Sequence, residues 1–256
     1  MKNKCSVILA GGLGTRMGKL TKTSPKTLIK VMGKPILWYI IKELLRNKFD
    51  KIIITLGYKG DKIKKYVEAA FPYETSKIFM IETGKFSSIS QRINKIKNYI
   101  DTDSFLLTNG DALFEIDYKK KKKYFDKLKL DALLFSFSMI ANFGIMELNR
   151  YNKISKFNKN QFFDLLIKKN KRKENFLIPY TGMAILKKEL LNTINFKNKK
   201  DFEIFFFNSL IRKKKVDFTR IDKFWFSFDS QKDLDMASIK ESFLNKNIYK
   251  IKNNYK

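Results

Sequence analysis

Histidine is absent from the 256 residues, and cysteine occurs once, at Cys5. Without an imidazole ring the chain cannot build a Ser-His-Asp triad, a histidine-ligated zinc site or a histidine general base. A single thiol cannot close an intramolecular disulfide. Any metal site must therefore be made from carboxylates.

Proline (4 residues) and glycine (11 residues) are scarce, and no linker rich in proline, glycine or serine divides the chain. The hydrophobic fraction of 44%, with 14% aromatic residues, is enough for a core. This composition excludes a disordered or collagen-like chain. We therefore expect one globular domain rather than two.

Long apolar runs are also missing. No stretch reaches the length of about 18 apolar residues that spans a bilayer. The first ten residues lack the apolar core and cleavage site of a signal peptide. We expect a cytoplasmic protein with no membrane partner.

Acidic residues are outnumbered by basic ones, 25 to 54, which gives a formal net charge of +29. Only seven of the basic residues are arginine, the side chain whose fork reads phosphates and base edges. The lysines therefore indicate compositional bias, and we expect no nucleic-acid partner, although the positive field favours small anionic substrates. The lysines at 119–123 are expected on the solvated side of a helix that buries Tyr124 and Leu128.

Short apolar runs alternate with amphipathic stretches, which is the pattern of βαβ units. Strands are predicted at residues 6–10, 51–56, 78–81, 105–108, 132–137, 144–148 and 183–186, and helices at 35–48, 89–99, 118–128, 202–211 and 231–243. The expected fold class is α/β, with a single Rossmann-like domain over residues 1–247 built on a mostly parallel twisted sheet with helices on both faces. Residues 248–256 are basic and unpatterned, so we expect a frayed tail there.

A glycine loop, Leu9-Ala10-Gly11-Gly12-Leu13-Gly14-Thr15-Arg16, follows the first predicted strand. Its glycines let backbone N–H groups approach an anion closely, and an arginine at its end can hold phosphate oxygens with both nitrogens. The spacing is not the G-x-G-x-x-G of dinucleotide-binding folds, and the Gly-Lys-Ser/Thr ending of a P-loop is missing. The segment indicates a phosphate-binding loop of another kind.

Three further segments carry charges that suit phosphate chemistry: Ser24-Pro25-Lys26, Asn109-Gly110-Asp111 and the apolar run that ends at Asp229. Pro25 fixes an extended backbone that presents Lys26 as a second cation near the glycine loop. Asp111 follows a strand at the carboxyl edge of the sheet, where open α/β folds bind ligands and where a carboxylate suits magnesium. A turn role for Asp111 and a helix N-cap role for Asp229 or Ser230 are the structural alternatives.

Taken in order over nearly the whole chain, these motifs resemble those of the sugar-1-phosphate nucleotidylyltransferases. Further segments resemble the glucose-1-phosphate cytidylyltransferase branch: Gly33-Lys34-Pro35-Ile36-Leu37-Trp38, Gly57-Tyr58-Lys59-Gly60, Glu82-Thr83-Gly84, Phe143-Gly144 and Phe224-Trp225. The resemblance implies in-line attack of a sugar-phosphate oxygen on the α-phosphorus of a nucleoside triphosphate, with Mg²⁺ as cofactor and pyrophosphate as the leaving group. It also implies a place in sugar-nucleotide synthesis for surface polysaccharides.

The resemblance implies roles for individual residues as well. Arg16 would hold the departing pyrophosphate, and Lys26 the sugar phosphate and the α-phosphate. Asp111 and Asp229 would hold the magnesium. The implied nucleotide-binding residues are Leu9, Ala10, Gly11, Gly12, Gly14, Thr15, Gln91, Arg92 and Gly110, and the implied sugar-phosphate-binding residues are Thr181, Gly182, Lys156 and Lys159.

Two departures from the cytidylyltransferase branch concern the predicted site residues. Residues 88–92 keep the arginine of a Thr-Gly-Gly-Arg loop but lose both glycines, so either this loop has moved away from the base or the Gln91 amide contacts the base edge, with CTP preferred. Residues 159–161 replace the family's Glu-Lys-Pro segment, which makes Lys156 and Lys159 the candidate substitutes for its lysine, with an ordinary surface lysine as the structural alternative for each.

Two other functions fit the same residues. One is cytidylyl transfer to a non-sugar phosphate, such as an amino-alcohol or cyclitol phosphate, and the other is non-catalytic binding of nucleotides or nucleic acid. Two aspartates beside a polyphosphate loop favour catalysis, because a binding protein has no use for two magnesium carboxylates. The expected partners are a nucleoside triphosphate and a phosphorylated small-molecule acceptor, and a homo-oligomer stays open.

Overall fold

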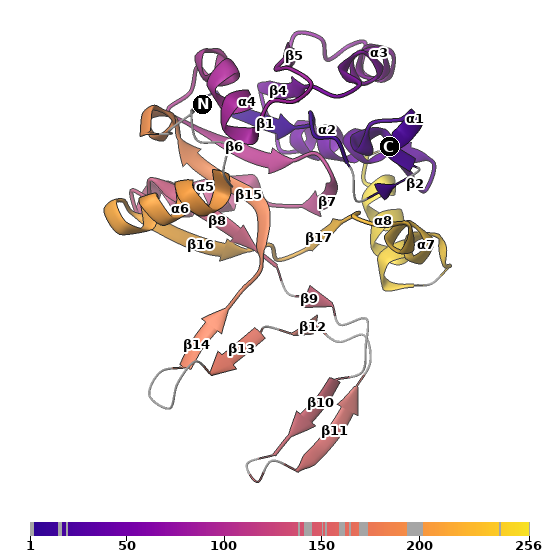
Figure 1. The fold of residues 1–256 in the computed structure, drawn as a ribbon, viewed down its shortest axis with the longest axis vertical. Helices are drawn as coiled ribbons and strands as arrows, with labels where there is room; N and C mark the ends of the chain where they lie inside the picture. The colour runs from indigo at the N-terminus through magenta and orange to yellow at the C-terminus, as the bar shows by residue number, and fades with distance from the viewer. Residues whose placement is uncertain are drawn as a thin grey trace.

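The computed structural model describes residues 3–14, 17–18, 20–137, 139–140, 145–149, 151, 153–158, 162–163, 165–168, 174–193, 202–240 and 242–255. Figure 1 shows a sheet with helices on both of its faces and small two-stranded hairpins below it in the view.

A seven-stranded sheet forms the centre of the described fold, in the order β16-β8-β15-β6-β1-β4-β5. Its strands are β1 (Cys5–Leu9), β4 (Lys51–Leu56), β5 (Ile78–Glu82), β6 (Ser104–Asn109), β8 (Ala132–Ser136), β15 (Tyr180–Lys187) and β16 (Val216–Arg220). β1 pairs in parallel with β4 and β6, as do β4 with β5 and β8 with β16, whereas β15 runs antiparallel to β6 and β8. The mostly parallel α/β sheet predicted from the sequence is confirmed.

Side chains along each central strand alternate between two separate cores. In β4, Ile52 and Ile54 pack into the core on one face, and Ile53 packs into the core on the other. Strands buried on both faces have no solvated side that polar residues could occupy. This is why β4 has a continuous apolar run instead of alternating apolar and polar residues.

Helices cover both faces of the sheet (Figure 1), and their side chains supply the other half of each core. Residues of α2 (Ile36–Arg46), α3 (Gly60–Ala70), α5 (Tyr118–Lys127), α7 (Gln231–Ser238) and α8 (Phe243–Asn253) pack on one face, and those of α4 (Ile89–Ile96) and α6 (Phe202–Lys213) on the other. The sequence patterns did not predict α3 or α8. Among the described residues, no helix is long and apolar enough to cross a membrane.

Shorter elements complete the described fold. They are the helices α1 (Leu20–Thr23), η2 (Lys26–Leu28), η3 (Lys97–Tyr99) and η4 (Lys188–Thr193), and the paired strands β2 (Lys30–Val31) with β3 (Lys34–Pro35), β7 (Ala112–Glu115) with β17 (Phe224–Ser227), β9 (Met139–Ile140) with β12 (Phe162–Phe163), β10 (Ile145–Leu148) with β11 (Ile154–Asn158), and β13 (Leu165–Lys168) with β14 (Glu174–Leu177). The β7–β17 pair, called the ribbon below, builds the candidate site.

A fully buried carboxylate, Glu43, fixes the far end of the ribbon. Its Oε1 accepts hydrogen bonds from Arg46 (2.7 Å), from the Asn47 amide (2.9 Å) and from the backbone N–H of Ile116 (2.8 Å). Its Oε2 accepts from Arg46 (2.8 Å) and from the Tyr255 hydroxyl (2.7 Å). Five donors replace the water that the charge loses on burial. Because Ile116 directly follows β7, the network ties α2, the ribbon and the end of the chain together.

The expected orientation of helix α5 is wrong. Lys121, in the middle of the lysine run, is buried, and its Nζ donates to three oxygens in residues 219–222 at 2.7–3.0 Å. Tyr124 and Leu128 are each 41% exposed, whereas Phe125 is buried. A lysine can leave water when its ammonium finds this many acceptors, which come here from a distant part of the chain.

The expectation of a frayed tail from residue 248 is also wrong. Helix α8 starts at the N-cap Ser242, whose hydroxyl accepts from the backbone of the third helical residue at 3.0 Å. Leu244, Ile248 and Ile251 lie on one side of the helix and are at most 5% exposed. The tail therefore packs into the core beside α2 and α7.

The packing of α8 can be tested with two neighbouring residues. Ile248→Ala should lower the free energy of unfolding by about 2–5 kcal/mol, because it leaves a cavity in the core. Tyr249→Ala, at a position that is 59% exposed, should change it by less than about 0.5 kcal/mol. Urea denaturation followed by circular dichroism measures both, and two equally small effects would mean that the tail is frayed after all.

Candidate active site

The glycine loop leaves β1 at the carboxyl end of the parallel strands. Residues 10–14 of the loop are described, whereas the predicted site residues Thr15 and Arg16 lie outside the described residues. A Cβ atom at Gly11 would overlap the guanidinium of Arg92, which donates to the Gly11 carbonyl at 2.7 Å. Only glycine lets the loop backbone lie this close to the buried arginine.

Gly110 continues the same edge of the sheet after β6. Its N–H donates to the Leu9 carbonyl at 3.1 Å. A Cβ atom there would lie 2.8 Å from the Thr27 methyl carbon and 3.0 Å from the Leu9 oxygen. The absence of a side chain lets β6, the start of the glycine loop and η2 meet, which places Asp111 beside Lys26.

Lys26 lies between two carboxylates. Pro25 has φ −65° and ψ 148°, the extended backbone predicted from the sequence, and η2 begins at the next residue. Lys26 Nζ is 2.7 Å from Asp111 Oδ2 and 2.8 Å from Asp229 Oδ1. Burial by itself would lower the pKa of Lys26, but the charges and hydrogen bonds of Asp111 and Asp229 outweigh it and raise the pKa above its ordinary value. The ammonium is therefore charged at neutral pH.

The ribbon explains how two aspartates so far apart in sequence come together. Asp111 immediately precedes β7 and Asp229 follows β17, whose Ser227 is paired with Ala112. The backbone N–H of Phe228 donates to the Asp111 carbonyl at 3.0 Å. Antiparallel pairing thus puts both carboxylates at one end of the ribbon.

Asp229 is oriented by its neighbours. The Ser227 hydroxyl donates to Asp229 Oδ2 at 2.9 Å, while Oδ1 accepts from Lys26. Ser230, not Asp229, is the N-cap of α7, and Asp233 Oδ2 accepts from its backbone N–H at 2.8 Å. The helix-cap alternative therefore holds for Ser230, and the Asp229 side chain faces the cavity.

The two aspartates suit magnesium. Each directs an oxygen to the same position, because an oxygen of each accepts a hydrogen bond from the Lys26 ammonium within 2.8 Å. Carboxylate oxygens are the ligands that Mg²⁺ prefers, and it characteristically takes one or two of them together with water and phosphate oxygens. Among the described residues, no group of three or more acidic or cysteine side chains forms a complete metal cage. The residues present fit a magnesium ion that takes its remaining ligands from water and from the phosphate oxygens of a substrate.

A cavity of about 530 Å³ opens at this end of the sheet. It is lined by the predicted site residues Leu9, Ala10, Gly11, Gly12, Gly14, Lys26, Arg92, Gly110, Asp111 and Asp229. Sequence reasoning missed other lining residues, which are Leu13, Thr27, Lys85, Phe86, Ser87, Ser88, Ile89 and Asn109. The available signal for residues 85–89 was a glycine, an aromatic residue and two serines between a strand and a helix.

Gln91, the residue expected to contact the base edge, is not among the described residues that line this cavity. Its Oε1 accepts a hydrogen bond from the backbone N–H of Ser88 at 2.9 Å, and its own N–H donates to the Ser88 hydroxyl at 3.3 Å. The two residues form a capping box at the start of α4. The amide oxygen is thus used within the helix.

Arg92 lines the cavity but is buried. Besides Gly11, its guanidinium donates to the Thr83 hydroxyl at 2.6 Å and to the Leu56 carbonyl at 3.2 Å. Burial lowers the pKa of Arg92, and the charge of Glu82 offsets part of this effect. In the structure this side chain holds the glycine loop, the end of β4 and the segment after β5 together.

Of the predicted sugar-phosphate residues, the three that the structure describes, Thr181, Gly182 and Lys156, are not among those that line the cavity. The Thr181 hydroxyl is buried and donates to a backbone carbonyl of β8 at 2.9 Å. Gly182 adjoins Asn109, whose side chain a Cβ atom would overlap. Lys156 is exposed on β11, and Lys159 lies outside the described residues.

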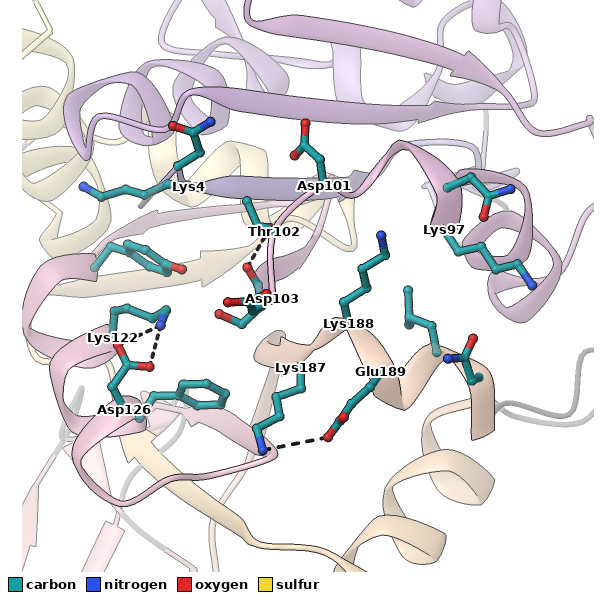
Figure 2. A pocket seen from close by; sticks show the side chains of 17 residues that line it. Lys4, Lys97, Asp101, Thr102, Asp103, Lys122, Asp126, Lys187, Lys188 and Glu189 are labelled. Atoms are coloured by element: carbon teal, nitrogen blue, oxygen red, sulfur yellow. Dashed lines mark hydrogen bonds and ion pairs between the residues drawn. The ribbon is translucent and has the colours of Figure 1, made fainter. Parts of the chain in front are cut away.

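A larger cavity of about 1280 Å³ lies at the opposite end of the strands, where β1 and β6 begin (Figure 2). Several of its charged side chains pair with one another, including Lys122 with Asp126 (2.7 Å) and Lys187 with Glu189 (3.8 Å). It contains neither the glycine loop nor the aspartate pair. The smaller cavity is therefore the candidate active site.

Several curated proteins have similar sequences. The chain is 35% identical to the probable glucose-1-phosphate cytidylyltransferase of Bacillus subtilis (strain 168) over 160 residues, which are 55% of this chain and 63% of that protein. It is 33% identical to the glucose-1-phosphate cytidylyltransferase of Salmonella typhimurium over 135 residues, 44% of this chain and 52% of that protein. The chain thus spans between half and two thirds of the length of these relatives.

Solved structures share the fold. A putative glucose-1-phosphate thymidylyltransferase from Bacillus anthracis, in complex with a sucrose, has a TM-score of 0.68 at 18% identity, over 91% of this chain and 93% of that chain. HddC from Yersinia pseudotuberculosis, complexed with GMP-PN, has a TM-score of 0.65 at 22% identity over the whole of both chains. At these identities the likeness concerns the fold alone.

The family model described as "Nucleotidyl transferase" matches residues 5–218, a stretch that begins at β1 and reaches into β16. The match includes the glycine loop, Lys26 and Asp111, so the same residues that form most of the cavity lie within it. Since it covers most of the chain, this protein belongs to the nucleotidyl transferase family.

Proposed function

We propose that the protein transfers a nucleoside monophosphate, with CMP favoured, from a nucleoside triphosphate to a sugar 1-phosphate and releases pyrophosphate. The observation that carries this proposal is the position of Lys26 between Asp111 and Asp229 in the cavity lined by the glycine loop. A cation and two carboxylates beside such a loop suit a polyphosphate and its magnesium. The relatives named glucose-1-phosphate cytidylyltransferase support CMP as the transferred group.

The proposed reaction depends on positioning and charge stabilisation. An oxygen of the acceptor phosphate attacks the α-phosphorus, the bond from that phosphorus to the bridging oxygen breaks, and pyrophosphate leaves with the electron pair. A phosphate oxygen is already anionic at neutral pH, so a chain without histidine lacks nothing that this step requires. The Lys26 ammonium stabilises the negative charge that develops on the phosphate oxygens.

Asp111 and Asp229 would hold magnesium, which when bound neutralises phosphate charge and helps to orient the triphosphate. A metal held by these carboxylates would compete with Lys26 for their oxygens, and an ammonium displaced from either carboxylate would have a donor free for a phosphate oxygen. Ser227 holds the second oxygen of Asp229, so this carboxylate keeps its orientation during the exchange.

A matrix of substrates tests the proposal. Each of the four nucleoside triphosphates is paired with a panel of sugar 1-phosphates and of amino-alcohol and cyclitol phosphates, and pyrophosphate release is measured. We expect release with sugar 1-phosphates, CTP first and UTP second, separated by about 1–3 kcal/mol, since few hydrogen bonds distinguish the two bases. If no pair of substrates released pyrophosphate, the proposal would be contradicted. Release with non-sugar phosphates alone would show that the acceptor is not a sugar 1-phosphate.

Asp111→Asn tests the metal carboxylate. The substitution keeps the shape of the side chain but removes the charge that offsets dehydration of the cation, so turnover should fall by about 10²-fold or more and magnesium should bind more weakly. Steady-state kinetics and calorimetric titration of Mg²⁺ measure the two effects. The control Asp235→Asn, on an exposed face of α7, should change neither. Full activity of Asp111→Asn would remove the basis of the proposed site.

Lys26→Ala separates the roles of the cation and the metal. Turnover should fall much more than triphosphate affinity, because the ammonium acts mainly on charge that develops in the transition state. Magnesium should bind at least as tightly as in the wild type, since its competitor for the carboxylates is gone. Both affinities and the turnover are measured on one protein preparation, with Lys30→Ala as the exposed control. Weaker magnesium binding would show that Lys26 supports the carboxylates instead of competing for them.

A further inference from the structure

Phe86 exposes an aromatic ring at the candidate active site. It is 78% exposed, yet it lines the same cavity as the glycine loop and Lys26. Leu13, which comes from the glycine loop, lines this cavity as well and is 41% exposed. Single exposed apolar residues are ordinary on protein surfaces, but here two of them come from separate loops to one cavity. They give this charged cavity an apolar part.

The turn that carries Phe86 is anchored on both sides. Before it, the hydroxyl of the buried Thr83 accepts from Arg92, and the Thr83 carbonyl accepts from the Ser87 hydroxyl. After it, Ser88 caps helix α4. Because both ends are held by hydrogen bonds, little conformational freedom remains to be lost when a ligand contacts the tip.

Lys85 supports the ring from the neighbouring position. Its Nζ lies 5.1 Å from the centroid of the Phe86 ring and 5.7 Å from that of Tyr58. Both distances are within the range of about 6 Å for a cation–π contact. The ammonium thus links the two aromatic residues and adds positive charge beside the cavity.

The chemical groups that line the cavity suit the two ends of a nucleoside triphosphate. Such a molecule is charged at its phosphate end and aromatic at its base. Lys26, Asp111 and Asp229 suit the phosphates, and Leu13 and the segment 85–89 bring apolar and aromatic side chains to the same lining. Gln91 is not part of that lining, and the exposed ring of Phe86 is.

We propose that the Phe86 ring is the stacking platform for the base of the bound nucleoside triphosphate, a role that rests on the proposed function. Stacking uses the π face that every base has, so Phe86 raises the affinity for all four nucleotides with little discrimination among them. The Phe86 side chain then supplies the affinity for the base that the glycine backbone supplies in a loop that keeps its glycines. Base preference must come from hydrogen bonds elsewhere in the lining.

Calorimetric binding of the four nucleoside triphosphates with Mg²⁺, and of inorganic tripolyphosphate, tests this role in the full-length protein. Phe86→Ala should weaken binding of each nucleotide by about 5-fold to 150-fold, which corresponds to about 1–3 kcal/mol. Tripolyphosphate has no base, so its affinity should stay the same. Phe86→Trp should keep the nucleotide affinity that Phe86→Ala loses, because indole offers a larger stacking surface.

Tyr73→Ala is the matched control, since it removes a 94% exposed aromatic side chain that does not line the cavity. It should leave every affinity unchanged. Unaltered nucleotide binding by Phe86→Ala would overturn the stacking role, while the wild type would still bind and turn over its substrates. Equal weakening of nucleotides and tripolyphosphate would also overturn it, because the loss would then not concern the base. A wild-type protein that binds no nucleoside triphosphate would contradict the proposed function itself.

Discussion

Two carboxylates can lie side by side in a cavity when a cation between them offsets their repulsion, and in this protein that cation is Lys26. The contact joins three parts of the chain that are far apart: η2, the turn before β7 and the turn after β17. The surrounding fold is arranged to make this contact possible. Gly110 lets the strand end approach η2, and the ribbon aligns Asp111 with Asp229.

The same contact links stability to the proposed chemistry. Without a substrate the ammonium offsets the charge of the two carboxylates, and a metal that bound them would free it for phosphate oxygens. Because the ammonium stays in the cavity, a bound Mg²⁺ would add two positive charges to its one, which suits a polyanionic triphosphate. This arrangement needs no titratable imidazole, which agrees with a chain that contains none.

The parts of the site that could be predicted are those whose signal is local. A glycine loop after a strand and an aspartate at a strand end point to the carboxyl edge of a parallel sheet wherever they occur. The Gln91 amide suits both a base edge and a helix cap, and in the structure its oxygen accepts from Ser88 at the start of α4. Ser88 and Gln91 have the spacing of a capping box in the sequence. The backbone N–H of Ser88, three residues from Gln91, can donate to the amide oxygen without any contact between distant segments of the chain.

Other features depend on tertiary contacts that no local pattern reveals. Lys121 is buried because residues 219–222 offer it three acceptors. The apolar stripe of α8, formed by Leu244, Ile248 and Ile251, is sparse among lysines and asparagines, and the burial of these side chains depends on their packing in the core. No sequence motif includes Phe86, and its proposed role follows only from its position in the cavity that the glycine loop also lines.

The ribbon has a consequence for folding. β7 and β17 are separated by more than a hundred residues, so their pairing closes a long loop, whereas the first βαβ unit forms from neighbouring segments. Long-range pairings of this kind are slow to form, because the entropy of closing the loop is lost before the contacts compensate for it. Among the described residues between Asp111 and Asp229, none lines the cavity. These residues thus contribute no group to the site, yet the second carboxylate is in place only when the ribbon has closed the long loop that they belong to.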